Sequence, residues 1–285
     1  MTSSEQATRA QLELITAREP HLLSPPEKGR GAGEWDTDTV RGRATDLRGV
    51  SGSSAPRFAV FDLDGTLHPD AMGILLLRDL RAAGICRSAP TERLFEFLGC
   101  RDQDRLHEPH SVSTAYQLYA QALRGCDRHR VEDVARRLWE REVGNVFAYV
   151  APVLRELRGR GTRLILISGS PQEVVEQVAL TLGFHQWRGA VLAAEDGLYT
   201  GQYSRTPAVA GEKLALAAHL VGGRQHLAQC AAVGNSASDI ELLAEVGRPV
   251  AFEAGPRLAD AARRLGWPLA DRSSLTTAMF GLPSR

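Results

Sequence analysis

The chain has 285 residues, of which 43% are hydrophobic, enough for one or two domains with a sizeable core. Its 34 basic and 34 acidic residues give a formal net charge of zero, so overall charge provides no attraction for nucleic acid or an anionic membrane. No apolar run approaches the roughly 20 residues of a membrane-spanning helix, and residues 1–20 lack the apolar stretch of a secretory signal. Four cysteines without a Cys-x-x-Cys pair indicate reduced thiols: Cys86, Cys100, Cys126 and Cys230. We therefore expect a cytoplasmic protein that binds neither membranes nor nucleic acid.

The first 56 residues differ in composition from the rest of the chain. After a short possible helix at residues 6–16, this segment is rich in proline, glycine and serine and has little aliphatic patterning. Such a composition buries too little apolar surface to offset the entropy that ordering costs. We expect residues 1–56 to form a largely disordered extension.

An apolar run that leads into two carboxylates begins at residue 58, with the sequence Phe-Ala-Val-Phe-Asp-Leu-Asp-Gly-Thr-Leu. An unbroken apolar run predicts a parallel strand buried on both faces, and ligands bind at the carboxyl ends of such strands. Asp62 and Asp64 leave the strand on the same side, where their like charges raise each other's pKa unless a cation lies between them. Gly65 allows a tight turn, and Thr66 offers a hydroxyl to an anion. The stretch therefore predicts a site for a metal and an anion.

Residues 70–142 show helical periodicity without β-branched runs. Four helices are expected there, at residues 70–81, 91–98, 111–124 and 130–142. Strands are predicted on both sides of them in the sequence. We therefore expect residues 71–149 to form a helical cap inserted into a catalytic core made of residues 57–70 and 150–285.

From residue 150 onward strands alternate with helices, which predicts a doubly wound parallel sheet. The expected strands are residues 163–167, 230–233 and 249–252, and the expected helices are residues 153–160, 172–182, 240–246, 257–265 and one that begins at Gly211. The Asp196-Gly197 pair predicts a tight hairpin turn between residues 191–194 and 198–203. The predicted fold class is α/β, with a Rossmann-like core and an inserted helical cap.

Further polar groups follow the other predicted strands. Ser168-Gly169 follows the second strand, Lys213 lies at the start of a helix, and residues 234–239 follow the third strand. Because the carboxyl ends of neighbouring parallel strands meet at one edge, these groups should share a crevice with the two carboxylates of the first strand. A serine in this position alone most often caps a helix, and a lysine alone is most often exposed. Their joint occurrence favours a site.

These stretches together resemble the motifs of the haloacid dehalogenase superfamily of phosphatases, in the phosphoserine phosphatase-like subgroup, which has a helical cap after the first motif. The residues that carry the resemblance are Asp62-Leu63-Asp64-Gly65-Thr66, Ser168, Lys213 and 234–239, with the hairpin 196–201 ahead of Gly211-Glu212-Lys213. The match covers about residues 57–270, in the order and spacing of the family, and is specific as a set.

The resemblance implies a Mg²⁺-dependent phosphatase that hydrolyses the phosphate monoester of a small metabolite through an aspartyl-phosphate intermediate. It makes Asp62 the nucleophile and Asp64 the general acid and base. Dehalogenases of this fold lack the second acid, because carbon–halogen hydrolysis has no alkoxide to protonate, so Asp64 favours a phosphate ester. The implied phosphate-binding residues are Thr66, Ser168, Gly169 and Lys213, and the implied metal ligands are Asp62, Asp64, Asn235 and Asp239.

Two positions depart from the family pattern. The fourth motif of the family has Gly-Asp, whereas this chain has Gly234-Asn235, and asparagine keeps a carbonyl oxygen but removes one negative charge. We expect Mg²⁺ to bind more weakly as a result, with Asp239 as a supporting partner or as a ligand through water. Phosphoserine phosphatases also carry a cap glutamate nine residues after the nucleophile, where this chain has Ala71 beside Asp70. That difference argues against phosphoserine itself as the substrate.

Two other functions stay open. The phosphoryl group of the intermediate could pass to an acceptor other than water, which would make the protein a phosphotransferase. Alternatively, the asparagine in the fourth motif could mark a catalytically weak protein that serves in binding, although the two aspartates, the serine and the lysine are all present.

Three histidines lie near the predicted motifs. His68 follows the first motif, where it either contacts substrate or occupies a surface position at the hinge into the cap. His107 and His110 occur in His-Glu-Pro-His and could be mistaken for metal ligands. Because the proline between them breaks helical spacing, we expect both in an exposed loop.

Deleting residues 1–54 is expected to leave the melting temperature and the catalytic rate nearly unchanged, because the composition of this segment assigns it no part in the core. Calorimetry and rate measurements on the full and shortened chains check this. Insolubility of the shortened chain, or a fall of more than about 4 °C, which is roughly 1 kcal/mol for a chain of this size, would show that the extension packs on the domain.

Overall fold

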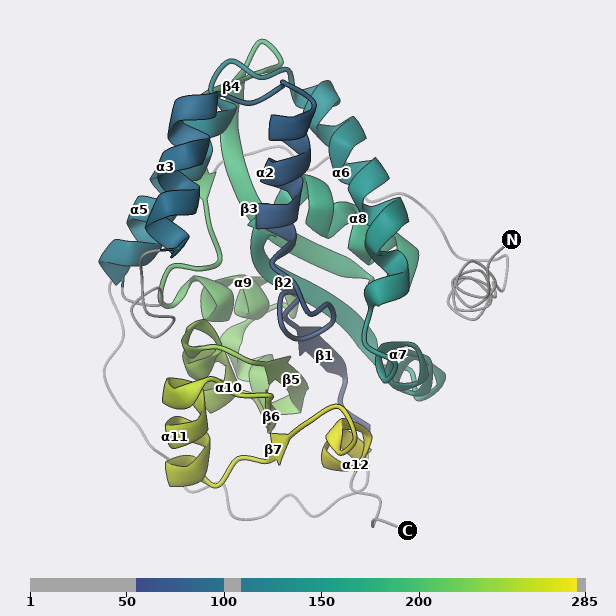
Figure 1. Ribbon diagram of the computed structural model, residues 1–285. Helices are drawn as coiled ribbons and strands as arrows, with labels where there is room; N and C mark the ends of the chain where they lie inside the picture. The colour runs from purple at the N-terminus through teal and green to yellow at the C-terminus, as the bar shows by residue number, and fades with distance from the viewer. Residues whose placement is uncertain (1–54, 100–108, 281–285) are drawn as a thin grey trace. The chain divides into compact units, whose positions relative to one another are not determined.

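The computed structural model describes residues 55–99 and 109–280, which include a seven-stranded sheet. Its strands are β1 (Phe58–Phe61), β2 (Arg163–Pro171), β3 (Gln186–Glu195), β4 (Leu198–Arg205), β5 (Cys230–Gly234), β6 (Arg248–Phe252) and β7 (Leu269–Ala270). They are arranged in the order β4-β3-β2-β1-β5-β6-β7 (Figure 1). All neighbouring pairs are parallel except β3 and β4, which form an antiparallel hairpin.

The order of the strands places a topological switch at β1. The chain adds β2 and β3 on one side of β1 and then returns to its other side with β5. In the register, Phe61 at the end of β1 lies opposite Leu166 of β2 and Val233 of β5. The residues that follow these three therefore emerge side by side at one edge, where ligands bind in sheets of this kind.

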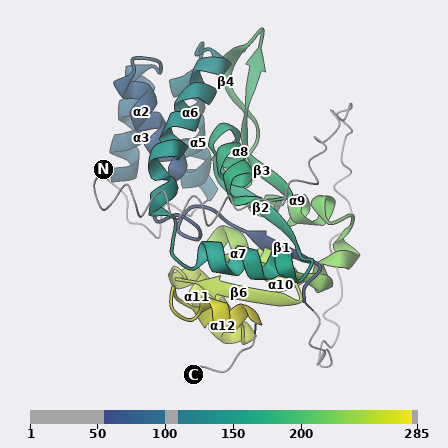
Figure 2. The same ribbon diagram turned by 90° about the vertical axis from the view of Figure 1, so that its right-hand side faces the viewer.

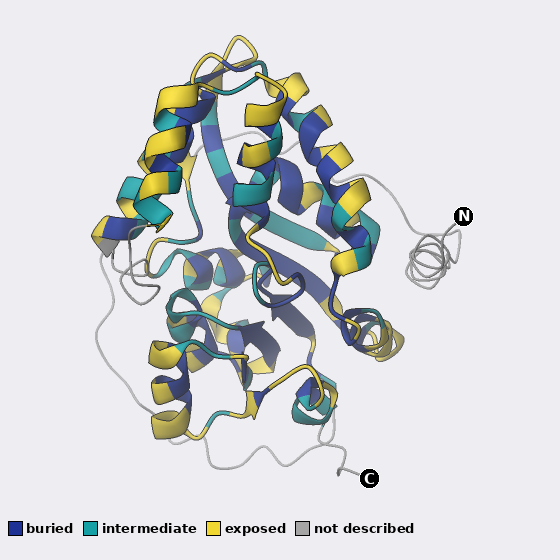
Figure 3. Ribbon diagram, in the orientation of Figure 1, coloured by how far each residue is buried: buried dark blue, intermediate teal, exposed yellow. Residues whose placement is uncertain are grey.

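Helices cover both faces of the sheet because alternate strand residues point to opposite sides. On one face Phe61, Leu166 and Val233 belong to a cluster with α7 (Val150–Gly159), α8 (Gln172–Leu182) and α12 (Leu275–Phe280). On the other face Val60, Ile165 and Ala232 belong to a cluster with α9 (Glu212–Leu220), α10 (Ile240–Glu245) and α11 (Pro256–Leu265). The central strands β1, β2 and β5 between them are almost entirely buried (Figure 3). This arrangement confirms the predicted α/β fold with a doubly wound core.

Four further helices lie together at one end of the sheet, beside the β3–β4 hairpin (Figures 1 and 2). They are α2 (Met72–Ala82), α3 (Ser88–Gly99), α5 (Pro109–Leu123) and α6 (Arg128–Glu142). Their apolar faces join the same buried cluster as α7 and α8. Across this contact Trp139 Nε1 of α6 donates a hydrogen bond of 2.8 Å to Thr181 Oγ1 of α8. The described residues form one compact unit, and the division at residues 71 and 149 stays a prediction.

The hairpin is hydrogen-bonded to the segment that connects α5 and α6. Gly125 N donates to Tyr199 O at 2.7 Å, and Tyr199 N donates to Cys126 O at 3.0 Å. The turn has positive φ at both Asp196 (49°) and Gly197 (80°), as the Asp-Gly pair predicts. The β3–β4 hairpin lies in the part of the sequence predicted as the core, yet it pairs with the segment between two of the predicted cap helices.

Three short elements connect the larger ones: the 3₁₀ helices η1 (Val143–Asn145), η2 (Arg224–Gln229) and η3 (Ala237–Asp239). None of the helices in the described part of the chain is long and apolar enough to cross a membrane. The three cysteines within it, Cys86, Cys126 and Cys230, are unpaired.

The prediction that His110 lies in a loop is wrong. His110 is exposed as expected, but it lies in the first turn of α5 and not in a loop. Pro109 occupies the first helical position, where a missing N–H costs no hydrogen bond, so the proline starts this helix instead of breaking it. The calls on His107 and Cys100, and those on residues 1–54, lie outside the described residues.

Gly189 tests the close packing of β3 against the start of α8. A Cβ atom at this position would lie 2.7 Å from Gln172 Cα and 2.9 Å from Ser170 O, both backbone atoms that a rotamer change does not move. We expect Gly189→Ala to lower the free energy of unfolding by about 1–3 kcal/mol, measured by urea denaturation. The matched control is Gly159→Ala in α7, where nothing lies within 4 Å and alanine favours the helix. Equal losses in the two variants would contradict this account of the packing.

Candidate active site

The first predicted carboxylate, Asp62, lies directly after β1 and stays fixed to the sheet. Its backbone N–H donates to Val233 O at 3.1 Å, which continues the ladder between β1 and β5 beyond the last strand residue. Its side chain is only 7% exposed, and its Oδ2 lies 3.1 Å from Lys213 Nζ. A buried carboxylate is thus held in one orientation at the edge of the sheet.

Lys213 reaches this edge from the first turn of α9 and contacts a second carboxylate. Its Nζ lies 2.6 Å from Asp239 Oδ1. The other oxygen of Asp239, Oδ2, accepts hydrogen bonds from Asn235 N at 3.1 Å and from Ser236 N at 3.0 Å and Oγ at 3.1 Å. Both oxygens of Asp239 are therefore engaged, one with the lysine and one with the loop that follows β5.

The charges of this cluster do not balance, because one lysine faces several carboxylates. Burial raises the pKa of Asp62 to about 7, with Asp239 and Asp64 adding to the rise while Lys213 opposes it. Burial also acts to lower the pKa of Lys213, but the carboxylates of Asp239 and Asp62 outweigh it and raise that pKa above its ordinary value. The lysine stays protonated, and the remaining negative charge favours an added cation.

Asp64 has a different environment from Asp62. Its Oδ1 accepts a hydrogen bond from Met72 N at 2.9 Å, and its Oδ2 accepts one from Ser170 Oγ at 2.7 Å. Burial raises the pKa of Asp64, and these two hydrogen bonds only partly offset the rise. The carboxyl group is therefore suited to hold a proton and to release it.

Further polar side chains and backbone groups follow β1 and β2 near the two aspartates. Ser168 Oγ lies 3.5 Å from Asp64 Oδ2 and accepts a hydrogen bond from Ser170 N at 3.0 Å. Thr66 Oγ1 is buried and has no hydrogen-bond partner among the described residues. The backbone carbonyl of Gly169, the residue after Ser168, accepts a hydrogen bond of 2.6 Å from Tyr116 Oη of α5. The contacts form two groups, Asp62 with Lys213 and Asp239, and Asp64 with Ser168. Asp62 and Asp64 lie two residues apart, and the charge of Asp64 acts on Asp62, so the two groups adjoin at this edge, with Thr66 in the same turn.

Asn235 presents an oxygen without a protein partner. Its Oδ1 is buried and accepts no hydrogen bond from the described part of the chain, while its Nδ2 packs against Gly65, where a larger residue would collide with it. No group of three or more His, Cys, Asp or Glu side chains able to hold a metal occurs in the described residues. Mg²⁺ does not need one, since it binds through one or two carboxylates together with other oxygens and water. Asp62, Asp64 and Asn235 Oδ1 fit that donor set, and their role as ligands stays a prediction.

Sequence reasoning missed two residues of this site. Ser170 donates to Asp64, and its Oγ also accepts the N–H of Gly73 at 2.9 Å, so it joins β2 to the start of α2. Its position two residues after Ser168 on a strand, and therefore on the same side, could have identified it. Tyr116 lies 53 residues from its partner Gly169, and no local pattern indicates that contact.

The expectation of a surface position for His68 is wrong. The side chain is fully buried, because the turn folds back on itself through hydrogen bonds from Gly65 N to His68 O and from His68 N to Leu63 O. His68 Nδ1 accepts the N–H of Asp70 at 3.1 Å, and Nε2 lies 3.8 Å from Glu142 Oε2 of α6. The histidine therefore packs between the turn and α6.

The fold and the site together define a doubly wound α/β protein with acidic side chains at the switch point of its sheet. Residues 59–244 match the model of the haloacid dehalogenase-like hydrolase family, and the chain belongs to that family. This confirms the resemblance that the motifs indicate and the expectation of a hydrolase.

Two relatives show how far the similarity extends. An inhibition of morphological differentiation protein from Streptomyces azureus is 28% identical over 239 residues, which are 79% of this chain and 82% of that protein. The phosphoserine phosphatase SerB1 of Mycobacterium tuberculosis is 31% identical over 131 residues, which are 44% of this chain and 41% of that protein. Among solved structures, a phospho-aspartyl intermediate analogue of phosphoserine phosphatase has a TM-score of 0.54 at 21% identity, covering 77% of this chain and 94% of that one. This last likeness concerns the fold.

Asn235→Asp tests the metal site. The change restores a charged oxygen at nearly the same size, and a charge-assisted contact exceeds a neutral one by about 1 kcal/mol. The dissociation constant of Mg²⁺, measured by calorimetry, should therefore fall by about fivefold or more. Gln202→Glu makes the same amide-to-acid change at an exposed position of β4 and should leave Mg²⁺ binding unchanged. Identical titrations for wild type and Asn235→Asp would mean that Asn235 does not face the metal.

Proposed function

We propose that the protein is a Mg²⁺-dependent phosphatase that hydrolyses the phosphate monoester of a small metabolite through an aspartyl-phosphate on Asp62. The observation that carries the proposal is the pair of buried acids with different surroundings, Asp62 beside Lys213 and Asp64 beside Met72 and Ser170. One acid is thereby kept near a cation, as a nucleophile requires, and the other is kept protonatable, as a general acid requires. Family membership and the phosphatase names of relatives support the same reaction class.

In the first half of the reaction, a carboxylate oxygen of Asp62 attacks phosphorus in line with the ester oxygen. The bond between phosphorus and the ester oxygen breaks, and the proton on Asp64 passes to that oxygen as the alcohol leaves. The raised pKa of Asp64 supports this role, because it increases the protonated fraction near neutral pH.

In the second half, Asp64 is a carboxylate and accepts a proton from the attacking water. The oxygen of that water bonds to phosphorus, and the bond between phosphorus and Asp62 breaks. Inorganic phosphate is released, and both aspartates return to their starting states. An alcohol in place of the water would give the phosphotransferase reaction, which product analysis with added alcohols distinguishes from hydrolysis.

The phosphate oxygens need positive charge and hydrogen-bond donors throughout. Lys213 Nζ and the free hydroxyl of Thr66 would supply part of this, with Ser168 and the N–H of Gly169 on the other side. Mg²⁺, held by Asp62, Asp64 and Asn235 with Asp239 supporting the loop, would neutralise further negative charge. The proposed setting is the cytoplasm, where unpaired thiols stay reduced.

Changing Asp62 to asparagine tests the nucleophile. An amide oxygen cannot form the acyl phosphate, so turnover of p-nitrophenyl phosphate and of alkyl phosphates should fall by about a thousandfold or more while the melting temperature stays close to that of wild type. A folded variant that retained more than about a tenth of the wild-type rate would rule out Asp62 as the nucleophile.

Asp64→Asn provides the comparison that separates the two acids. An alkoxide needs a proton to leave, whereas p-nitrophenolate does not, and general acid catalysis contributes about 10²- to 10⁴-fold. In single-turnover experiments the variant should therefore lose that factor with an alkyl phosphate and much less with p-nitrophenyl phosphate. Equal losses with both substrates would remove Asp64 from the role of general acid.

A further inference from the structure

A pocket of about 170 Å³ is lined in part by Asp64. It lies among α2, α3, α5, β2 and β4, so the cap helices and the hairpin form most of its wall. Its apolar and aromatic lining includes Ile74, Leu94, Leu98, Ala115, Tyr119 and Tyr203. Because Asp64 is the group that protonates the departing oxygen in the proposed reaction, this pocket is where the alcohol part of the ester would lie.

Among the described residues, Asp64 is the one charged side chain of the lining, which contains no Lys, Arg, His or Glu. Ala71 lies at the start of α2 on the same wall. Burial raises the pKa of Tyr119 and of Tyr203 well above the ordinary value, so both hydroxyls stay neutral. An ammonium or carboxylate group on the alcohol would lose its hydration in the pocket. The one charged group it would meet there is Asp64, which the proposed reaction uses as an acid and base, so the lost hydration would not be compensated.

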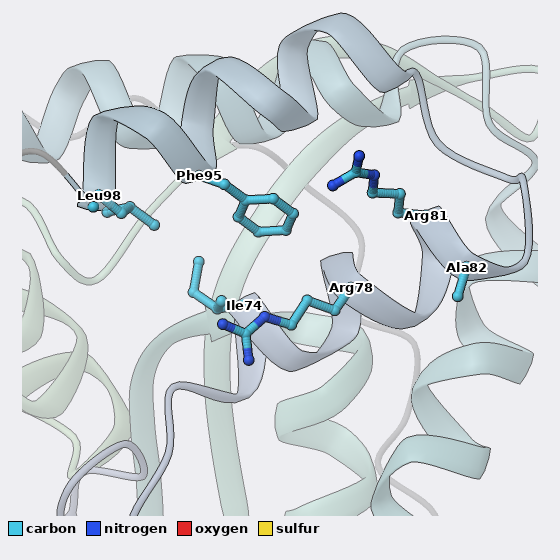
Figure 4. A pocket seen from close by; sticks show the side chains of 7 residues that line it. Ile74, Arg78, Arg81, Ala82, Phe95 and Leu98 are labelled. Atoms are coloured by element: carbon cyan, nitrogen blue, oxygen red, sulfur yellow. The ribbon is translucent and has the colours of Figure 1, made fainter.

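Positively charged side chains lie outside this pocket. Ile74 and Leu98 also line a neighbouring groove between α2 and α3, where Arg78 and Arg81 project from α2 beside Phe95 (Figure 4). Arg81 is paired with Glu92 at 3.0 Å. The two arginines line this outer groove and not the pocket. The part of the pocket next to Asp64 is therefore lined by apolar and aromatic side chains.

Two tyrosines of α5 belong to the pocket wall. Tyr116 Oη donates to Gly169 O at 2.6 Å. Tyr119, one turn later, is 6% exposed, and its Oη is buried and makes no hydrogen bond within the described residues. Because this hydroxyl is closed to solvent, Tyr119 contributes to the lining through its ring and not as a hydrogen-bond donor.

The size of the pocket limits what it can hold. An apolar protein cavity of about 150 Å³ takes up one benzene molecule, so 170 Å³ admits a group of about one six-membered ring. A methyl or hydroxymethyl group would leave most of this space unfilled and would forgo the free energy of burying apolar surface.

We propose that the pocket binds the alcohol part of the substrate, and that this alcohol is uncharged and about the size of one six-membered ring. This inference rests on the proposed phosphatase function. It names the class of ester, an apolar ring-sized monophosphate, that the site takes in preference to a small or zwitterionic one.

The first experiment compares esters of primary alcohols, so that the leaving groups have similar intrinsic reactivity. For wild-type protein with Mg²⁺, kcat/KM of benzyl phosphate should exceed that of methyl phosphate and of phosphoserine by about tenfold or more, from the apolar surface buried. Equal or lower values for benzyl phosphate, with the other two esters turned over, would overturn the pocket assignment and leave the phosphatase function standing.

Two variants locate the effect in the pocket. Ala115→Phe fills part of the space from α5, where Ala115 is only partly buried, and should remove the preference for benzyl phosphate while methyl phosphate is still hydrolysed. The control is Tyr199→Phe, which removes a buried hydroxyl that donates to Glu173 Oε1 at 2.5 Å outside the pocket lining and should leave the preference for benzyl phosphate unchanged.

A binding measurement keeps the test independent of turnover. Benzylphosphonate has no ester bond to cleave, so calorimetric titration reports its affinity whether or not the chain hydrolyses esters. Benzylphosphonate should bind wild type at least about tenfold more tightly than methylphosphonate does, and this difference should vanish in Ala115→Phe. Equal affinities for the two phosphonates would overturn the inference, whereas a large difference together with no hydrolysis of any ester would uphold the pocket and overturn the phosphatase function.

Discussion

The ammonium group of Lys213 lies inside the protein between Asp62 and Asp239, and the arrangement of the whole site depends on this contact. Removing Lys213 would leave two buried carboxylates without their cation, a loss that typically costs about 3–5 kcal/mol, whereas neutralising one acid leaves the lysine paired with the other. The three groups come from the residue after β1, from α9 and from η3, so their attraction holds three separate parts of the chain at one edge of the sheet. One lysine cannot neutralise the negative charges of Asp62, Asp239 and Asp64 together. The site therefore keeps a net negative charge that favours the binding of a cation.

The topology of the sheet explains why so few side chains suffice to build the site. β1 lies between β2 and β5, and their matched register brings the residues after Phe61, Leu166 and Val233 to one level. Asp239 accepts hydrogen bonds from the N–H groups of Asn235 and Ser236 and so fixes the loop after β5. The side-chain oxygen of Asn235 is thereby held in place, although it accepts no hydrogen bond from the residues that the structure describes. The positions of these groups are thus set by buried backbone contacts made before any ligand binds, which is the condition for electrostatic catalysis without reorganisation.

Much of the core could be predicted from the sequence because its features are local. Apolar runs mark β1, β2 and β5, glycines and prolines mark the ends of helices, and polar residues directly follow the strands. The features that could not be predicted depend on contacts between distant residues or on very short elements. Tyr116 meets Gly169 only after α5 has packed on the hairpin, His68 is buried only because its turn folds back, and β7 and α12 are too short for periodicity to reveal. The orientation of the cap helices, and with it the pocket beside Asp64, belongs to this second group.

The start of α2 is attached to the general acid of the proposed reaction. Met72 N–H donates to Asp64 directly, and Gly73 N–H reaches it through Ser170. A protonated carboxyl group accepts hydrogen bonds less strongly than a carboxylate, so a proton on Asp64 loosens the hold on α2. By reciprocity, any outward shift of α2 raises the affinity of Asp64 for a proton. Asp64 gains and loses a proton in every proposed turnover. Movement of α2, which forms part of the pocket wall, is therefore thermodynamically coupled to the protonation of Asp64. The same coupling links the chemical step to the entry and exit of the alcohol.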